Sequence, residues 1–497
     1  MRILVAAVVA LLSVGLLGAA PVMTPFDPAV HGFHFANTFV NDFVPDQNLR
    51  TGGLCGGMSY AALDFYNARR PIPTQDYRPA KGTPLQGYLY SRQVHSIMAN
   101  VDTWVDLLLN PADVDSAGQF RSGLDGRPGG QLAELRSFID RRVPVPLKLK
   151  AAQGRSGDHQ VLAIGYDLGA YQGDLGDHAS DLAIIVCDPN HPRVAMRLAP
   201  DTEHSIWVKQ DAAGAVIAGS GWRSWSVDKS YDAMVPPDIA SPAYPADGLI
   251  HELNIACQTG ADDLRGDSAN LDLTVALTDG SSQTYPNINL GARWIPFYEE
   301  TACVVLREPL APERLREITL STPAFGVAGD TWGLLYAEVR ARGGNVDLPH
   351  IARSGFHRFA ADDLRVSLPV SLRPTSPAGQ VSLLKLNLQT GADELRGGSA
   401  NLDITLRLRD GSQQVFANAN HGQRWAAGLR TSLALPLARP LPPADVAALV
   451  LTVGADTTWT LSSLEVRAEG SDLDRRLAWF GRKQFGGETH EAVLPMP

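Results

Sequence analysis

A tandem repeat occupies the second half of this 497-residue chain and constrains its fold more than any other feature of the sequence. The segment TGADDLRGDSANLDLTVALTDG at 259–280 returns as TGADELRGGSANLDITLRLRDG at 390–411, an offset of 131 residues. Self-similarity of this kind is the signature of a duplicated structural module. We therefore predict that residues 249–370 and 371–497 are two copies of one domain.

Each copy alternates apolar and polar residues with a period of two. One apolar face per strand is typical of a half-buried antiparallel sheet, and an Asp-Gly pair after each alternating segment supplies a turn. We expect each copy to be an all-β sandwich. The pattern resembles lipoxygenase-homology-like sandwich domains that accompany bacterial exoenzymes. In the first copy the apolar positions are Leu271, Leu273, Val275 and Leu277.

The start of the chain, MRILVAAVVALLSVGLLGAAPV, has the composition of a secretory signal peptide. One arginine precedes an apolar stretch, and small residues follow it at the expected cleavage site. We assign residues 1–20 to this signal and expect a secreted or periplasmic protein. The alternative is an uncleaved anchor, because the apolar stretch approaches the roughly 20 residues of a membrane span. We expect no other transmembrane segment.

The charge and composition of the sequence limit the classes of partner that the protein is expected to bind. The net charge is -10 and charged residues make up 19% of the sequence, so the basic surface of a nucleic-acid binder is not expected. A stretch rich in proline and small residues at 236–248 is predicted to be a linker. It separates the repeats from a first domain at 21–235, which has mixed helix and strand signals.

A lone cysteine, Cys55, lies between two pairs of glycines in GGLCGGMSY, where a loop is predicted to become a helix. At a helix start, the unpaired backbone N–H groups and the helix dipole stabilise a thiolate and lower the thiol pKa. The glycines let the backbone approach a substrate carbonyl closely. Cys55 is therefore a candidate nucleophile, and its N–H is a candidate donor to an oxyanion. The alternative is a small buried hydrophobic residue.

A thiolate nucleophile needs a base, and the base needs an orienting group. We predict that 159–166 and 182–188 are the two arms of an antiparallel hairpin. This pairing brings His159 and Asp188 nearly opposite each other, within reach of a hydrogen bond. Asn190 is an alternative orienting residue, because an amide fills that role in known enzymes. Without this pairing, His159 is a strand-end histidine and Asp188 a turn residue.

These residues resemble a papain-like cysteine peptidase. Cys55 starts a helix, His159 opens a strand as H-x-V-L-x-I-G-Y, and Asp188 lies in a D-P-N turn. Among such peptidases, the resemblance is to the branch that removes double-glycine leader peptides from secreted bacterial peptides. It covers about residues 35–235 and implies Cys55, His159 and Asp188 as the catalytic residues.

The resemblance implies a fold class for the chain: an α+β papain-like N-terminal domain followed by two all-β sandwich repeats. It also implies a side-chain donor to the oxyanion. Papain-like enzymes have a glutamine six residues before the cysteine, whereas this chain has Leu49 there. Gln47 and Asn48 are the nearby candidates for that donor.

Two further sites are predicted in the first repeat. Cys257 and Cys303 have no cysteine counterparts in the second copy, and neighbouring strands in an oxidising compartment would allow a disulfide between them. A run rich in oxygen ligands suggests structural calcium, although the shared fold explains the same residues more simply. No other cofactor is expected. The calcium candidates are Asp262, Asp263, Asp267, Asn270 and Asp272.

The sequence leads to three hypotheses about function. The first is an exported cysteine peptidase-like hydrolase that attacks a peptide, protein or other acyl substrate through Cys55 and His159. Its sandwich repeats would bind a surface polymer, glycan or lipid. The second is a secreted binding or adhesion protein with a papain-like pseudoenzyme domain. The third is a transglutaminase-like acyltransferase, in which an amine replaces water as the acceptor.

Overall fold

The computed structural model describes most of the chain, in eight stretches. The predicted signal residues 1–19 and both oxyanion candidates, Gln47 and Asn48, lie outside them. The described residues are 20–44, 49–101, 116–152, 157–267, 269–323, 331–372, 376–454 and 457–497.

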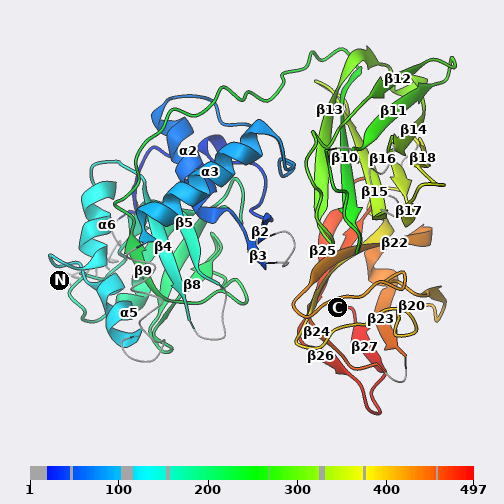
Figure 1. The fold of residues 1–497 in the computed structure, drawn as a ribbon. Helices are drawn as coiled ribbons and strands as arrows, with labels where there is room; N and C mark the ends of the chain where they lie inside the picture. Colours follow the sequence, from blue (N-terminus) through cyan, green and yellow to red (C-terminus); the bar gives the residue numbers. More distant parts are fainter. Residues whose placement is uncertain are drawn as a thin grey trace, which may run out of the picture. The chain divides into compact units, whose positions relative to one another are not determined.

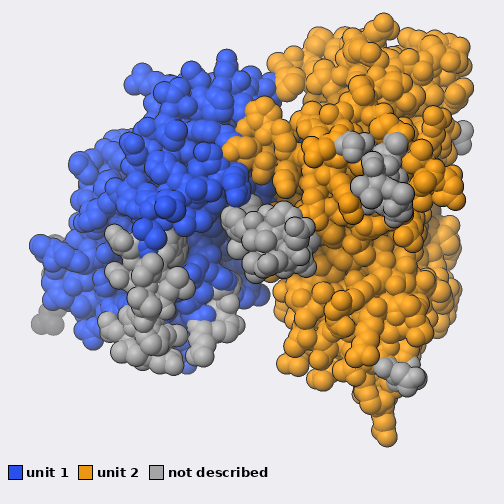
Figure 2. All heavy atoms as spheres, viewed as in Figure 1, with its two compact units in different colours: residues 1–39, 52–77, 88–241 blue, residues 40–51, 78–87, 242–497 orange. Residues whose placement is uncertain are grey.

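The chain divides into two compact units, coloured separately in Figure 2. The boundary between them, after Ser241, falls within the stretch predicted as a linker. Unit 1 comprises Met1–Phe39, Gly52–Tyr77 and Tyr88–Ser241, and unit 2 comprises Val40–Thr51, Arg78–Gly87 and Pro242–Pro497.

Unit 1 is built around an antiparallel sheet of seven strands (Figure 1). The last strand, β6, also pairs with β5, so β4 to β9 close into a barrel. Its interior holds large apolar side chains, among them Leu147, Val161, Ile184 and two fully buried tryptophans, Trp207 and Trp225. In sheet order the strands are β1 (Val22–Met23), β5 (His159–Asp167), β4 (Val145–Ala151), β9 (Trp222–Val227), β8 (Ile206–Gln210), β7 (Ala195–Asp201) and β6 (Ala183–Cys187).

Helix α2 (Cys55–Asn67) is the most deeply buried helix described in this unit, since every residue from Gly56 to Phe65 is buried. Helix α3 (Pro84–Ala99) lies so close to it that a Cβ on Gly57 would fall 2.1 Å from the Leu89 carbonyl oxygen. No helix among the described residues combines the length and apolarity needed to cross a bilayer. The other helices are α1 (Pro28–His31), α5 (Ser116–Leu124) and α6 (Gln131–Ile139).

The predicted fold class, an α+β papain-like N-terminal domain followed by two all-β repeats, is wrong in its N-terminal part. Strands make up 43% of the described residues and helices only 14%, and the N-terminal unit shows no α+β papain-like domain. The physical reason lies in its core, because the main apolar cluster comes mostly from the strands of a closed antiparallel barrel, with further residues from α5 and α6. The helical signal around 55–67 came from one deeply buried helix and did not reflect a helical half-domain.

In unit 2, each repeat consists of two antiparallel sheets around one apolar core (Figure 1). The first repeat pairs β13 (Glu299–Leu310), β10 (Ile250–Thr259), β15 (Trp332–Arg342), β16 (Asp347–Ser354) and β17 (His357–Phe359), and its second sheet contains β12 (Ser282–Tyr285), β11 (Asp272–Leu277), β14 (Leu315–Ser321) and β18 (Arg365–Pro369). The second repeat pairs β22 (Arg430–Leu441), β19 (Val381–Thr390), β24 (Trp459–Glu469), β25 (Asp474–Phe480) and β26 (Lys483–Phe485), and its second sheet contains β21 (Gln413–Phe416), β20 (Leu402–Leu408), β23 (Val446–Val453) and β27 (Glu491–Pro495). A two-stranded sheet of β2 (Val40–Val44) and β3 (Leu49–Gly52) completes the description.

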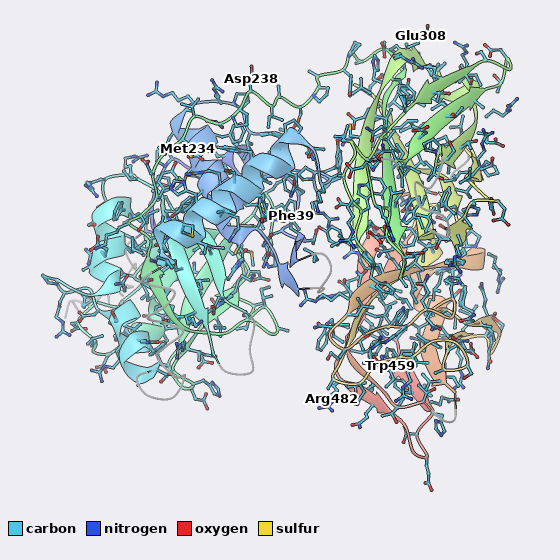
Figure 3. All side chains as sticks on the ribbon, viewed as in Figure 1. Phe39, Met234, Asp238, Glu308, Trp459 and Arg482 are labelled. Carbon is cyan, nitrogen blue, oxygen red and sulfur yellow. The ribbon has the colours of Figure 1, made fainter. Side chains whose placement is uncertain are left out.

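The two repeats build their cores from the same aromatic residues. Trp294 contacts Trp332 with ring centroids 6.2 Å apart, and Trp425 contacts Trp459 at 6.0 Å. All four indoles are fully buried, and Trp459 lies at the start of β24 (Figure 3). These tryptophans therefore act as packing residues and present no surface to a ligand.

Polar contacts join the two repeats. The Lys385 ammonium of the second repeat lies 2.9 Å from the Glu299 carboxylate of the first, which also accepts a 2.5 Å hydrogen bond from the Tyr336 hydroxyl. Burial raises the pKa of Glu299, but the charge of Lys385 outweighs it and holds that pKa at about 2. A second ion pair joins Arg353 to Glu469 at 3.2 Å. The two repeats are thus joined by ion pairs, each of which has one residue in the first repeat and one in the second.

Gly266, whose equivalent in the second repeat is Gly397, gives a test of the repeat fold when it is compared with Gly280. Gly266 has φ +80°, and a Cβ there would lie 2.3 Å from the Gly291 carbonyl oxygen. Gly280 also has positive φ, at +87°, but its Cβ would meet nothing within 4 Å. We expect Gly280→Ala to cost about 1–2 kcal/mol from backbone strain alone. Gly266→Ala should cost at least about 2 kcal/mol more, because the clash adds to the strain. Urea unfolding of both variants measures the difference, and equal costs would contradict the close approach.

Candidate active site

Cys55 is the first residue of α2, and the loop before it is held by a side chain from elsewhere in the chain. The Leu54 N–H donates to Asn37 Oδ1 at 2.6 Å, and Gly53 adopts φ +83°, which favours glycine. The backbone N–H groups of Gly56 and Gln160 are near the Cys55 sulfur and help to lower the thiol pKa. The thiol thus lies at a helix start beside two backbone N–H groups, an arrangement that favours the thiolate.

His159 begins β5, and Asp188 directly follows β6. His159 Nε2 lies 2.8 Å from Asp188 Oδ1, and the Cys55 thiol is close enough to the same imidazole for each group to shift the pKa of the other. Because Nε2 is engaged by the carboxylate, Nδ1 is the ring atom left for the sulfur. The structure therefore brings together the three side chains that the sequence nominated.

A strand irregularity decides which face of the sheet Asp188 reaches. Ala163 pairs with Val186 and Gly165 with Ile185, so Ile164 is an extra residue in β5. Strand pairing beyond this bulge sets Leu162 opposite Cys187, which places Asp188 on the same face as Val161 and His159. A regular ladder would have turned the carboxylate to the other face.

Asp188 has two further partners. Lys209 Nζ lies 2.6 Å from its Oδ2, and the Asn190 N–H donates to Oδ1 at 2.8 Å. Burial raises the pKa of this carboxyl, but the charge of His159 and then that of Lys209 outweigh it, and the pKa lies well below its ordinary value. Asn190 is exposed and contributes its backbone, so Asp188 is the group that orients the imidazole.

The imidazole of His159 is fixed from its face as well as from its edge. The Trp222 ring stacks on it at 6.1 Å with an interplanar angle of 19°, and Lys209 Nζ lies 5.9 Å from the same indole. His159 is only 7% exposed. Stacking, burial and the Asp188 hydrogen bond together restrict the ring to one orientation.

Mutual electrostatics shift the pKa values of the thiol and the imidazole in opposite directions. Burial raises the pKa of Cys55, but the hydrogen bond and charge of His159 outweigh it, so the pKa falls below its ordinary value. Burial lowers the pKa of His159, yet the charge of Asp188 and the hydrogen bonds from Asp188 and Cys55 raise it to about 10. Near neutral pH this arrangement favours a thiolate–imidazolium pair.

Cys187 shows what the same residue type does without these partners. It borders a small cavity together with Gly32, Met58 and Leu162. Burial, followed by the charge of Asp188, raises its pKa to about 12. Cys187 is therefore an unreactive thiol in the same unit and an internal reference for Cys55.

The disulfide predicted between Cys257 and Cys303 is wrong, because neither cysteine forms a disulfide. The two residues do lie on the paired strands β10 and β13, but Cys303 pairs with Asn254 and Cys257 pairs with Glu300. Cys257 is fully buried in the core, whereas Cys303 is exposed on the other face of the sheet. Side chains on opposite faces of one sheet cannot form a disulfide.

The predicted calcium ligands have protein partners. Asp262 accepts from the Thr331 hydroxyl, and Asp263 pairs with Arg293. The remaining candidates form the turn that follows: Asp272 Oδ1 accepts from the Asn287 N–H at 2.8 Å, Asn270 Oδ1 accepts from Asn289 Nδ2 at 3.2 Å, and the Asp267 N–H donates to the Gly291 carbonyl at 3.1 Å. These contacts describe a hydrogen-bonded loop and give no converging set of calcium oxygens.

Elsewhere in the described chain, Glu338, His350 and Glu469 bring three metal-ligating atoms within 4.8 Å of one another. The guanidinium of Arg353 lies among them, 2.5 Å from Glu338, 2.8 Å from His350 Nδ1 and 3.2 Å from Glu469. This side chain supplies the positive charge that a metal ion would otherwise provide. The cluster is therefore a network of polar contacts centred on the guanidinium.

The sequence missed several residues that support the site. Gln160 accepts from the Ser96 hydroxyl at 2.7 Å and donates to Asp228 Oδ2 at 3.0 Å, which fixes the backbone N–H that faces the sulfur. Lys209 and Trp222 were also missed, because they lie on β8 and β9, far along the chain from their partners. The one available signal for Gln160 was its position directly after His159.

Comparisons with known proteins give this chain no family. No family model and no curated protein matches it. Among solved structures, Clostridium perfringens alpha-toxin from avian strain SWCP matches with 16% identity and a TM-score of 0.21, over 28% of this chain and 35% of that one. The alpha toxin of Clostridium absonum matches with 15% identity and a TM-score of 0.19, over 25% of this chain and 34% of that one. The matches span about a third of each toxin, and no functional conclusion follows from them.

None of these comparisons supports the resemblance to papain-like peptidases. The roles of Cys55, His159 and Asp188 therefore rest on their chemistry.

We expect iodoacetamide to alkylate Cys55 at least about tenfold faster than Cys187 at pH 7.5, because the two thiol pKa values are shifted in opposite directions. The Cys55 rate should rise with pH through its lowered pKa. In His159→Gln the imidazolium is gone, so the thiol pKa rises and the profile moves to higher pH. Peptide mass spectrometry measures each site separately. Equal slow rates at Cys55 and Cys187 would contradict an activated thiol.

Loss of Lys209 tests the buried charge arrangement. Lys209→Met leaves Asp188 buried with less compensation, and we expect a loss of about 3 kcal/mol in the free energy of unfolding. The matched control is Lys150→Met, because the pair of Lys150 with Asp158 is partly exposed and should contribute less than about 1 kcal/mol. Urea denaturation measures both, and similar small losses would show that Lys209 is dispensable.

Proposed function

We propose that this protein is an exported cysteine hydrolase that acts by acyl transfer through Cys55, with His159 as acid–base and Asp188 as its orienting group. The observation that supports the proposal most directly is the convergence of three side chains: His159 Nε2 lies 2.8 Å from Asp188 Oδ1, and the interaction of the same imidazole with Cys55 lowers the thiol pKa and raises the pKa of the imidazole to about 10. A cysteine with a purely structural role does not require an imidazole beside its sulfur. The free Cys187, in the same unit, shows the opposite shift.

In the proposed reaction the Cys55 thiolate attacks the carbonyl carbon of an amide or ester, and the carbonyl oxygen becomes an oxyanion. The bond to the leaving group then breaks, and the His159 imidazolium gives its proton to that group. A thioester remains on Cys55. The neutral imidazole next takes a proton from water, the hydroxide attacks the thioester, and the carboxylic acid leaves as the thiolate–imidazolium pair is restored.

Asp188 contributes through the imidazole and makes no bond to the substrate. Its hydrogen bond to Nε2 keeps Nδ1 directed at the sulfur and stabilises the positive ring. Lys209 compensates the charge of Asp188, so the carboxylate stays ionised although it is only 1% exposed. The Trp222 face prevents the ring from turning away during the two proton transfers.

The signal-like start of the chain is the basis for proposing export, and the tandem repeats suggest how the enzyme reaches its substrate. When one of two identical modules on a chain has bound a repetitive surface such as a polymer or glycan, the effective concentration of the other module at that surface is raised. We therefore propose that unit 2 binds such a surface and that unit 1 performs the acyl transfer.

The test uses the full chain and p-nitrophenyl acetate, an activated ester. Wild type should release a burst of one equivalent of nitrophenol and gain one acetyl group on Cys55. Cys55→Ser should show neither, and His159→Gln should acylate at least about 10³-fold more slowly. Peptide mapping and stopped-flow absorbance measure these outcomes.

Wild type without a burst, alongside normal folding, would favour the alternative of a non-catalytic binding protein. Partition of the acetyl group between water and an added primary amine separates hydrolysis from acyl transfer. We expect water to be the acceptor, and a product consisting mainly of the acetylated amine would overturn the hydrolase assignment.

A further inference from the structure

We propose that the Asn37 carboxamide is a catalytic residue whose Nδ2 donates to the oxyanion formed at Cys55. The inference rests on the proposed cysteine chemistry and names a residue that the sequence did not nominate. Attack by a thiolate places a full negative charge on the former carbonyl oxygen, and that oxygen needs at least two hydrogen-bond donors in a low-dielectric site. The backbone N–H of Cys55 is one. A second donor must come from a side chain or another amide.

Asn37 lies between the two halves of the site. Its backbone N–H donates to the Pro189 carbonyl at 2.9 Å, which fixes it beside Asp188. Its side chain reaches the loop before α2, where Oδ1 accepts from the Leu54 N–H at 2.6 Å. Residue 37 thereby connects the turn that carries the acid with the turn that carries the nucleophile.

The hydrogen bond from Leu54 also decides which way the carboxamide points. Only its oxygen can accept a backbone N–H, so the other end of the group is the Nδ2 donor. Among the residues that the structure describes, no acceptor takes Nδ2. The side chain is partly exposed, so a bound substrate can reach it.

Gly53 shows how closely this donor approaches the nucleophile loop. A Cβ on Gly53 would lie 2.7 Å from Asn37 Nδ2 and 3.3 Å from Oδ1, at a backbone φ of +83°. Any side chain at residue 53 would therefore displace the carboxamide. Of the two glycines before Cys55, Gly53 is thus the one that makes room for the Asn37 carboxamide.

Two N–H groups of the helix start have protein acceptors. The Gly57 N–H donates to Gln93 Oε1 at 2.9 Å, and the Met58 N–H donates to the Leu54 carbonyl at 2.8 Å. The Gly56 N–H is near the sulfur and helps to lower the thiol pKa. Within the described stretches nothing accepts the Cys55 N–H. This N–H and Asn37 Nδ2 are thus donors left available for an oxyanion beside the sulfur.

The test separates attack on a carbonyl from the nucleophilicity of the thiol. Asn37→Asp keeps an oxygen for the Leu54 N–H and replaces the Nδ2 donor with a second oxygen. We expect acylation by p-nitrophenyl acetate to fall about 10²-fold, the usual effect of losing one oxyanion donor. Alkylation by iodoacetamide should change by less than about threefold at its high-pH plateau, because displacement of iodide places no charge on a carbonyl oxygen.

Two further variants make the result unambiguous. Asn67→Asp adds the same charge at the exposed last residue of α2, away from the site, and it should leave acylation within about threefold of wild type. Asn37→Ser is uncharged and too short to reach the Nδ2 position, so it should reproduce the selective loss of acylation, including the case in which Asn37→Asp does not fold.

Acylation within threefold of wild type in a folded Asn37 variant would overturn the proposal. A parallel loss of alkylation and acylation would overturn it too, because Asn37 would then only hold the Cys55 loop. Either result leaves the Cys55 burst of wild type intact and is therefore distinct from a failure of the proposed function, in which wild type itself gives no burst.

Discussion

The site depends on one buried hydrogen bond, between His159 Nε2 and Asp188 Oδ1 at 2.8 Å. A carboxylate that is only 1% exposed remains charged because the imidazole and the ammonium of Lys209 compensate it. The carboxylate in turn keeps the imidazole protonated, and the protonated imidazole lowers the pKa of Cys55. Each group holds its charge because its neighbour does, so loss of one member changes the protonation of the others.

The fold supplies this pair through the closure of the barrel. Strands β5 and β6 are separated by a long loop in the chain, yet they pair and complete the ring of strands. The bulge at Ile164 then selects the face on which Asp188 lies. Strands β8 and β9 bring Lys209 and Trp222 to the same end of the barrel. Helix α2 supplies the sulfur from outside the sheet, so the candidate nucleophile and the candidate base come from different elements.

The repeats illustrate how one fold acquires asymmetric contacts. Their tryptophan cores are equivalent, with Trp294 and Trp332 matched by Trp425 and Trp459. Their surfaces differ, because Glu299 and Tyr336 of one copy receive Lys385 of the other. A duplicated module keeps the residues that fill its core, whereas its surface is free to specialise. In this chain the specialised surface residues join one copy to the next.

Local patterns were sufficient for part of this protein. The 131-residue repeat, the strand alternation of 271–277 and the glycine-flanked Cys55 at a helix start all depend on neighbours along the chain. Pattern analysis failed where side chains meet across the sheets. It assigned the wrong fold class to the N-terminal unit, because one buried helix does not reveal the barrel beside it. It paired Cys257 with Cys303, because strand adjacency does not fix the register that puts them on opposite faces.

The sequence by itself determined the duplication, the nucleophile's position at a helix start and the chain order of cysteine, histidine and aspartate. Only the tertiary structure decided that Lys209, Trp222 and Asn37 surround these three, and that Asp188 shares a face with His159. The physical reason is that helix starts and strand alternation arise from interactions between residues close in sequence. Pairing between distant strands, with its bulges and closure, depends on the packing of the whole core.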